Sequence, residues 1–228
     1  MIQTNATIYL SEQRGCTQTD TFRSFHTFNF GSFFDENKTP FGNLQAFNED
    51  TLMPNAVVKQ KIDPQTTVIF LPIFGTIEVK NDFHTEGSFV TVGEAYFYTT
   101  VDEEDIEICH PFDAGMVSYL QIRLQNTDNQ PFNTSNETAF DFKNAKNQLL
   151  PYFSNQTNFG FIGQYDGRKE SVYTLKNPQN GIFVFVIEGV FEVQNRLLHA
   201  RDGLALPDIS EIELEALSND AVVLLLEI

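Results

Sequence analysis

The sequence predicts an all-β protein made of two similar small barrels, and two observations lead to this prediction. The first is an internal repeat with an offset of about 110 residues. The second is a series of short apolar segments separated by Gly, Pro, Asn and Asp at intervals of about 8 to 12 residues, which is typical of β-sandwiches and jelly rolls. The length of 228 residues agrees, because it exceeds a typical domain of about 150 residues and suits two small ones.

The repeat is clearest around two glycines. Gly75 and Gly189 lie 114 residues apart, and each is followed by an apolar residue, Glu, Val and later Asn at the same spacing. Each glycine also follows an apolar segment rich in β-branched and aromatic residues, which predicts a strand before a tight turn. Three further pairs of segments keep the same order along the chain: 93–95 with 203–205, 105–108 with 211–214, and 116–124 with 221–228.

The repeat and the polar stretch between its two copies predict the domain boundaries. We expect an N-terminal domain over residues 1–125, a linker over residues 126–158 and a C-terminal domain over residues 159–228. Helix is scarce in this pattern, and residues 140–150 are the segment in which one or two short helical turns are expected.

Charge and hydropathy exclude several classes of protein. Fourteen Lys and Arg against 31 Asp and Glu give a formal net charge of −17, which repels phosphate backbones and anionic lipids. No apolar run approaches the roughly 18 residues that span a bilayer. Direct nucleic-acid binding and membrane insertion are therefore not expected. The N-terminus has no signal-peptide pattern, which predicts a cytoplasmic protein whose two cysteines, Cys16 and Cys109, are free thiols.

A block near the N-terminus points to a family. Residues 20–35 read DTFRSFHTFNFGSFFD, residues 41–50 read FGNLQAFNED, and Met53 and Pro54 follow. This block closely resembles the N-terminal block of the pirin family. The resemblance implies a bicupin, that is, two jelly-roll (double-stranded β-helix) barrels packed face to face with little helix. The phenylalanines of the block occupy both even-numbered and odd-numbered positions, so an extended segment carries rings on both of its faces. We therefore expect this segment to be buried on both sides.

The resemblance also implies where chemistry is expected. Pirin-like proteins include iron-dependent quercetin dioxygenases, nuclear coregulators and bacterial members of unassigned function. The family's iron site uses three His and one Glu, and counting from the shared glycines places those positions near Lys61, Asp63, Ile106 and Ile108. These residues lack the imidazoles that such a site needs, so no pirin-type metal and no cofactor are expected. The four residues instead mark a candidate pocket, either apolar or closed, in which Lys61 and Asp63 are ion-paired or simply solvated.

Other reactive groups are sparse. His84, Cys109 and His110 are the only plausible soft metal ligands of the first domain, but adjacent residues on a strand point to opposite faces. Cys109 is a candidate redox-sensitive thiol if it is exposed, although a buried thiol is the commoner case. His199 is expected at a surface turn, and neither a nucleophile elbow nor a glycine-rich phosphate loop is present.

The sequence therefore favours a metal-free pirin-like bicupin that binds a small molecule or a protein, rather than an enzyme. The expected partners are a small apolar ligand in the N-terminal barrel or another protein. The alternative is a dioxygenase related to quercetin 2,3-dioxygenase whose metal site is unidentified. A weaker third hypothesis is a redox or stress responder that uses Cys109.

Overall fold

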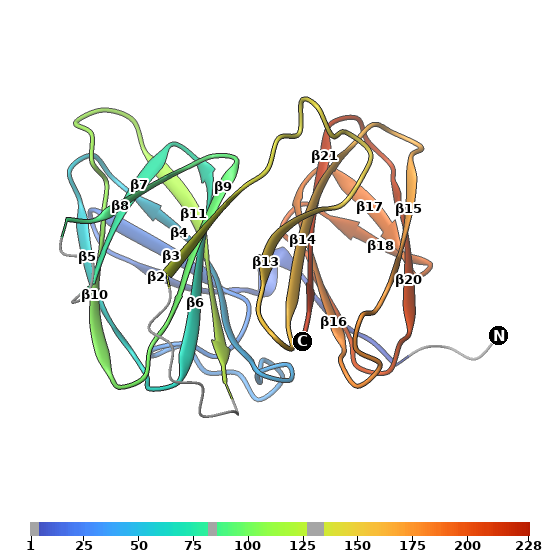
Figure 1. Ribbon diagram of the computed structural model, residues 1–228, viewed down its shortest axis with the longest axis horizontal. Helices are drawn as coiled ribbons and strands as arrows, with labels where there is room; N and C mark the ends of the chain where they lie inside the picture. Colours follow the sequence, from blue (N-terminus) through green and yellow to red (C-terminus); the bar gives the residue numbers. More distant parts are fainter. Residues whose placement is uncertain (1–4, 82–85, 127–134) are drawn as a thin grey trace. The chain divides into compact units, whose positions relative to one another are not determined.

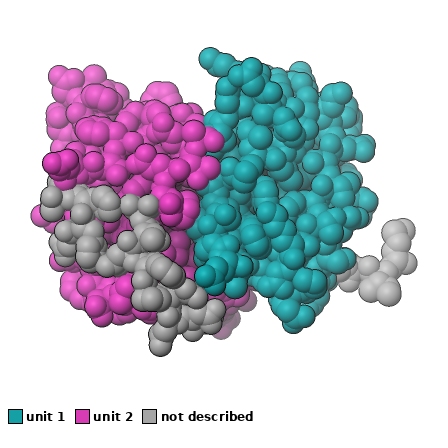
Figure 2. Space-filling model, in the orientation of Figure 1, with its two compact units in different colours: residues 1–14, 140–228 teal, residues 15–139 magenta. Residues whose placement is uncertain are grey.

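The computed structural model describes residues 5–81, 86–126 and 135–228, and it confirms the all-β prediction (Figure 1). The chain forms two compact units, coloured separately in Figure 2. We call residues 15–139 the N-terminal unit, and Met1–Arg14 together with Phe140–Ile228 the C-terminal unit. The only helical element among the described residues is a single 3-10 turn at Ser11–Gln13.

The N-terminal unit consists of two antiparallel sheets. One has seven strands in the order β12-β9-β6-β11-β4-β3-β2, and the other has four strands in the order β5-β10-β7-β8. Its strands are β2 Gly15–Gln18, β3 Phe22–His26, β4 Leu44–Leu52, β5 Val57–Ile62, β6 Thr66–Phe74, β7 Thr76–Asn81, β8 Ser88–Thr91, β9 Glu94–Thr99, β10 Glu104–Cys109, β11 Val117–Gln125 and β12 Ser135–Ala139.

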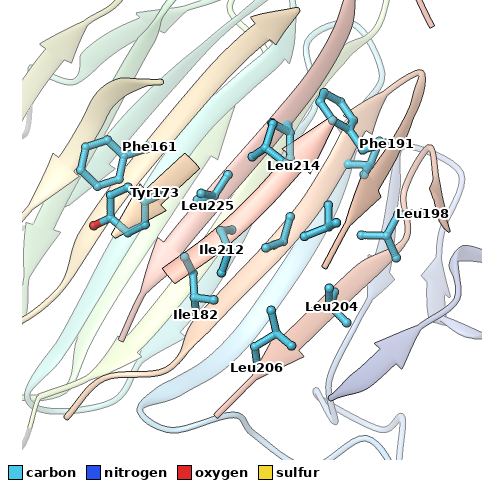
Figure 3. Packing of buried hydrophobic residues seen from close by; sticks show 14 of the residues in the cluster. Phe161, Tyr173, Ile182, Phe191, Leu198, Leu204, Leu206, Ile212, Leu214 and Leu225 are labelled. Atoms are coloured by element: carbon cyan, nitrogen blue, oxygen red, sulfur yellow. The ribbon is translucent and has the colours of Figure 1, made fainter. Parts of the chain in front are cut away.

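The C-terminal unit repeats this plan with a six-stranded and a four-stranded sheet. Their orders are β1-β19-β16-β21-β14-β13 and β15-β20-β17-β18. Side chains from both sheets, among them Phe161, Tyr173, Phe191 and Leu214, form one buried core (Figure 3). The strands are β1 Thr7–Tyr9, β13 Leu150–Ser154, β14 Phe159–Tyr165, β15 Glu170–Thr174, β16 Ile182–Glu188, β17 Val190–Val193, β18 Arg196–His199, β19 Gly203–Leu206, β20 Glu211–Ala216 and β21 Ala221–Glu227.

The strand orders confirm the internal repeat. The series β9-β6-β11-β4-β3 of one unit corresponds to β19-β16-β21-β14-β13 of the other. The paired glycines have the same conformation, because Gly75 has a φ of 80° and Gly189 a φ of 79°. A Cβ at Gly75 would lie 2.7 Å from Val117 Cγ1, and one at Gly189 would lie 2.7 Å from Ala221 Cβ. Each glycine thus permits a left-handed turn that passes close to the first residue of the last strand in its repeat.

The unit boundaries differ from those expected from the sequence. Residues 1–14 belong to the C-terminal unit because β1 pairs with β19, and residues 135–139 belong to the N-terminal unit because β12 pairs with β9. Both segments are assigned to their units by backbone pairing with a strand elsewhere in the chain, and the composition of a segment does not indicate such pairing. The helical turns expected over residues 140–150 are absent, since this segment forms turns and bends before β13. Residues 127–134 of the expected linker lie outside the described residues.

Candidate functional site

The structure separates the four predicted pocket residues into two pairs. Ile106 and Ile108 are fully buried in the core of the N-terminal unit, as a barrel-lining position requires. Lys61 and Asp63 are exposed, so their placement in the pocket is wrong. Lys61 does form an ion pair, but its partner is Glu103, whose Oε1 lies 2.6 Å from Lys61 Nζ, and not Asp63.

The predicted positions at strand β5 differ from the inward-facing ones by one residue. In the pairing of β5 with β10, Gln60 lies opposite Ile106 and Ile62 lies opposite Glu104. Directly opposed residues share a face of an antiparallel sheet, so Gln60 and Ile62 face inward while Lys61 faces outward. Ile62 is fully buried, in agreement with this assignment.

The inner face of the seven-stranded sheet carries polar side chains that the sequence pattern did not reveal. On β4 and β11, Asp50 lies opposite Tyr119 and Asn48 lies opposite Gln121. Arg123 follows on the same face of β11, with Val68 of β6 and then Tyr98 of β9 beside it in register. We call the following seven residues the barrel polar cluster: Asn48, Asp50, Gln60, Tyr98, Tyr119, Gln121 and Arg123.

Arg123 is the cation of this cluster. Its guanidinium donates hydrogen bonds to Gln60 Oε1 at 2.5 Å, to the Lys61 carbonyl at 3.1 Å and to Gln121 Oε1 at 3.3 Å. Gln121 Nε2 also donates to Gln60 Oε1 at 2.8 Å, which fixes the amide between them. The ring of Phe30 covers the guanidinium, with its centroid 5.0 Å from Cζ. The side chain is 9% exposed, and burial lowers the pKa of Arg123 below its usual range.

Asp50 is the anionic group of the cluster and is completely buried. Burial raises the pKa of Asp50 from 3.8 to about 7, while the neighbouring Ser24 and Tyr119 hydroxyls and the charge of Arg123 oppose this shift. Neither carboxyl oxygen of Asp50 meets a donor at full hydrogen-bond geometry. Asp50 therefore changes its charge near neutral pH inside the barrel.

His26, from the pirin-like block, has a structural role beside the cluster. Its Nε2 lies 2.9 Å from Thr17 Oγ1, and its Nδ1 lies 3.0 Å from Asn48 Oδ1. The rings of Phe30 and Phe33 pack against the imidazole at centroid distances of 5.1 and 6.3 Å.

The aromatic block is buried only in part. Phe28 is fully buried, but Phe34 is 79% exposed. The expectation of burial on both sides fails there because β3 ends at His26 and the chain continues as a loop, so the alternation of a strand no longer applies.

Those remaining candidate groups that the structure describes do not form a reactive site. Cys109 is buried, and burial raises the pKa of its thiol, which opposes thiolate chemistry. His110 is also buried and its Nδ1 accepts a hydrogen bond from the Phe112 backbone N–H at 3.1 Å. His199 is exposed at the end of β18, and His84 lies outside the described residues.

A transition metal does not fit the residues at the inner positions. Gln60, Ile62, Ile106 and Ile108 offer one amide and three aliphatic groups, whereas an iron site in this fold requires imidazoles and a carboxylate. Within residues 5–81, 86–126 and 135–228, no group of three or more His, Cys, Asp or Glu is placed to hold a metal ion. In the same residues, no helix is long and apolar enough to cross a membrane.

Comparison with known proteins agrees with the fold. The structure matches that of YhhW from Escherichia coli with a TM-score of 0.86 and 18% identity, covering 98% of this chain and 97% of that one. It matches the nickel(II) complex of the same bacterial pirin with a TM-score of 0.85 and 17% identity, over 98% of this chain and 99% of that one. A quercetin 2,3-dioxygenase from Acinetobacter baumannii matches with a TM-score of 0.72 and 12% identity, over 97% and 78% of the two chains.

Sequence comparison identifies the second domain. Residues 155–228 match the family model described as the quercetinase C-terminal cupin domain. No curated protein matches the chain by sequence. The second domain thus resembles the quercetinase C-terminal cupin domain, and the chain as a whole has the bicupin fold of the bacterial pirin YhhW.

Proposed function

We propose that this protein is a metal-independent bicupin that binds a small polar molecule inside its N-terminal barrel. The observation that carries the proposal is a set of buried polar atoms without hydrogen-bond partners in the barrel polar cluster. They are Asn48 Nδ2, both carboxyl oxygens of Asp50, the hydroxyls of Tyr98 and Tyr119, and Arg123 Nε.

Such atoms are rare in folded proteins, and each typically costs about 1 to 3 kcal/mol when it is buried and unpaired. Their concentration on one inner face is difficult to explain by packing alone, because apolar side chains of similar volume would avoid the cost. A bound polar molecule would satisfy several of them at once. The ligand therefore differs from the apolar one expected from the sequence, since donors and acceptors lie beside the aliphatic side chains of Ile106 and Ile108.

A dioxygenase with an unidentified metal site is the second candidate, and the quercetinase description of the C-terminal domain is the observation in its favour. The residues at the inner positions of β5 and β10 favour the first candidate, because Gln60, Ile62, Ile106 and Ile108 include no imidazole or carboxylate.

Metal analysis separates the two functions. The full chain is produced without a metal-affinity tag in medium supplemented with iron, nickel and copper, and its metal content is measured by plasma mass spectrometry. We expect no stoichiometric transition metal. One equivalent of iron, nickel or copper that remains after gel filtration would contradict the proposal and favour the dioxygenase.

A further inference from the structure

Arg123 is a buried cation without an anionic hydrogen-bond partner. All of its hydrogen bonds within the described part of the chain are accepted by neutral oxygens, those of two glutamine side chains and one backbone carbonyl. Buried charges in proteins are normally paired, because desolvation of an isolated ion is costly. The Phe30 ring compensates part of this cost on one side of the guanidinium, but it leaves Nε without an acceptor.

The hydroxyls of Tyr98 and Tyr119 lie near the same charge. Both side chains interact electrostatically with Arg123. The Tyr98 hydroxyl has no hydrogen-bond partner, and the Tyr119 hydroxyl lies beside the Asp50 carboxyl without full hydrogen-bond geometry. Tyr98 and Tyr119 are 3% and 0% exposed, so water at the surface does not serve them. Arg123 Nε and the Tyr98 hydroxyl are thus two unpaired donors on one inner face, and the Tyr119 hydroxyl becomes a third when Asp50 does not engage it. A group of donors around one cation is the arrangement that binds an anion.

The C-terminal unit shows how the same fold treats a buried charge when it is purely structural. The Glu227 carboxylate is fully buried and accepts hydrogen bonds from the Tyr173 hydroxyl and from the backbone N–H groups of Lys176 and Asn177, the latter two at 3.0 and 2.8 Å. Every one of these donors belongs to the protein. Among the described residues, Arg123 donates no hydrogen bond to a carboxylate, although the charges of Asp50 and Asp63 act on it. Its Nε is therefore open to an anionic acceptor from outside the chain.

We propose that the N-terminal barrel binds a small monocarboxylate with an apolar body, whose carboxylate pairs with Arg123 Nε and accepts hydrogen bonds from Tyr98 and Tyr119. This inference rests on the proposed function. A single negative charge fits best, because Arg123 is the only cation of the cluster and two acidic side chains, Asp50 and Glu104, are buried nearby. The fully buried Ile62, Ile106 and Ile108 provide the apolar surface for the body of the ligand.

Asp50 couples this binding to a proton. It lies opposite Ser24 of β3 and Tyr119 of β11, and the charges of Arg123 and of Glu49, the adjacent residue on its own strand, also act on it. His26 is the next inward residue of β3, opposite Asn48. A bound carboxylate repels the ionised form of Asp50 and favours the protonated form, which is also able to donate a hydrogen bond to the ligand. Binding should therefore take up a proton and tighten as the pH falls from 8 to 6.

Calorimetric titration of the full chain tests the inference with butyrate and benzoate, each compared with its neutral amide. We expect at least one carboxylate to bind at least tenfold more tightly than its amide, because charge-assisted hydrogen bonds are stronger than hydrogen bonds between neutral groups. Arg123→Met should abolish this binding. Tyr98→Phe, which removes a single hydroxyl and should fold normally, should weaken it severalfold. Tyr152→Phe is the matched control, because Tyr152 is an equally buried tyrosine of the C-terminal unit whose hydroxyl also lacks a partner.

The outcomes distinguish the inference from the function on which it rests. If an amide binds as tightly as its acid and Tyr98→Phe weakens the binding of both, the preference for a carboxylate is contradicted, but binding of a small molecule in the N-terminal barrel is supported. If the carboxylates bind and only Tyr152→Phe weakens their binding, the assignment of the site to the N-terminal barrel is contradicted. If none of the four compounds binds, the inference is overturned, whereas the proposed function is contradicted by the metal result described above.

Discussion

Asp50 is the residue whose environment differs most from that of an ordinary aspartate. Its carboxyl is fully buried on the inner face of the barrel, and its pKa rises to about 7. A carboxyl whose pKa is higher in the folded than in the unfolded state stabilises the fold below the unfolded pKa and loses that contribution as the pH rises through the folded pKa. The window for Asp50 therefore extends from about pH 4 to about pH 7.

Asp50→Asn should remove this pH dependence. The shift from 3.8 to about 7 corresponds to a loss of stability on the order of 4 kcal/mol at most between pH 4 and pH 8. We expect the variant to gain stability relative to the wild type as the pH rises from 5 to 8, as measured by urea unfolding at several pH values. Asp63→Asn, at an exposed position of the same unit, is the control and should leave the curve unchanged. Parallel curves for the wild type and Asp50→Asn would show that Asp50 ionises normally.

The sequence predicted apolar residues of the barrel interior but not its polar ones. Ile106 and Ile108 are buried, as their alternation with charged residues along one strand indicates. The barrel polar cluster was missed because polar residues on strands usually face solvent. The alternation of Tyr119, Gln121 and Arg123 was a usable signal, since the residues between them, Leu120 and Ile122, are apolar and so leave no obvious solvent face.

Strand β5 shows how a single residue of register changes the interpretation of a site. Counting from a shared glycine placed Lys61 and Asp63 inside, whereas the pairing with β10 places Gln60 and Ile62 there. A slip by one residue exchanges the two faces of a strand. The alternation of Lys59 and Lys61 with less polar neighbours already favoured the observed register.

Cysteine labelling tests this register directly. In a Cys16→Ser background, Lys61→Cys should react rapidly with a maleimide, because Lys61 is exposed. Ile62→Cys, at the adjacent and fully buried position, should react only on unfolding. The rates are followed by mass spectrometry of the intact protein. Rapid labelling at position 62 together with protection at position 61 would reverse the assignment of inner and outer faces.

The turns at Gly75 and Gly189, which precede β7 and β17, should differ in their tolerance of a side chain. Gly189→Ala should destabilise its unit more than Gly75→Ala, because the new Cβ would lie 3.0 Å from the Ala221 backbone as well as near Ser218. Gly75→Ala meets mainly the Val117 side chain, which can shift. We expect losses of about 1 to 3 kcal/mol from the positive φ and the close contacts.

Gly115→Ala is the matched control for both substitutions. Its φ is 77°, but nothing lies within 4 Å of a Cβ at that position, so only backbone strain of about 1 kcal/mol is expected. Thermal unfolding of the three variants measures the order. Equal losses at all three positions would show that the close approach to the last strand of each repeat has no energetic consequence.

At the scale of the whole molecule, the chain is a duplicated unit in which one edge strand of each copy comes from a distant segment. β1 pairs with β19 almost 200 residues later in the chain, and Tyr9 packs edge-on against Phe183 with ring centroids 6.1 Å apart. The internal repeat predicted two copies and the order of their shared strands. It did not predict β1 or β12. These strands of three to five residues occupy the same edge position in the two sheets, but they come from non-equivalent places in the sequence and so leave no repeat signal.

Tyr9→Ala tests whether the N-terminal segment stabilises the C-terminal unit. Tyr9 is 6% exposed, and loss of its ring should destabilise that unit by about 2 to 4 kcal/mol. Hydrogen exchange should then become faster in β19 and β16 and stay unchanged in β4 and β11. Leu10→Ala, at the neighbouring but exposed position, is the control. Unchanged protection of β19 in Tyr9→Ala would contradict the assignment of residues 1–14 to this unit.

The most direct test of the central claim is an electron-density map of the N-terminal barrel at a resolution that resolves individual waters. We expect density for a small non-metal molecule within hydrogen-bond distance of Arg123 Nε and of the Tyr98 and Tyr119 hydroxyls. A metal ion bound among the side chains of β5 and β10, or water alone satisfying every unpaired atom of the barrel polar cluster, would contradict it.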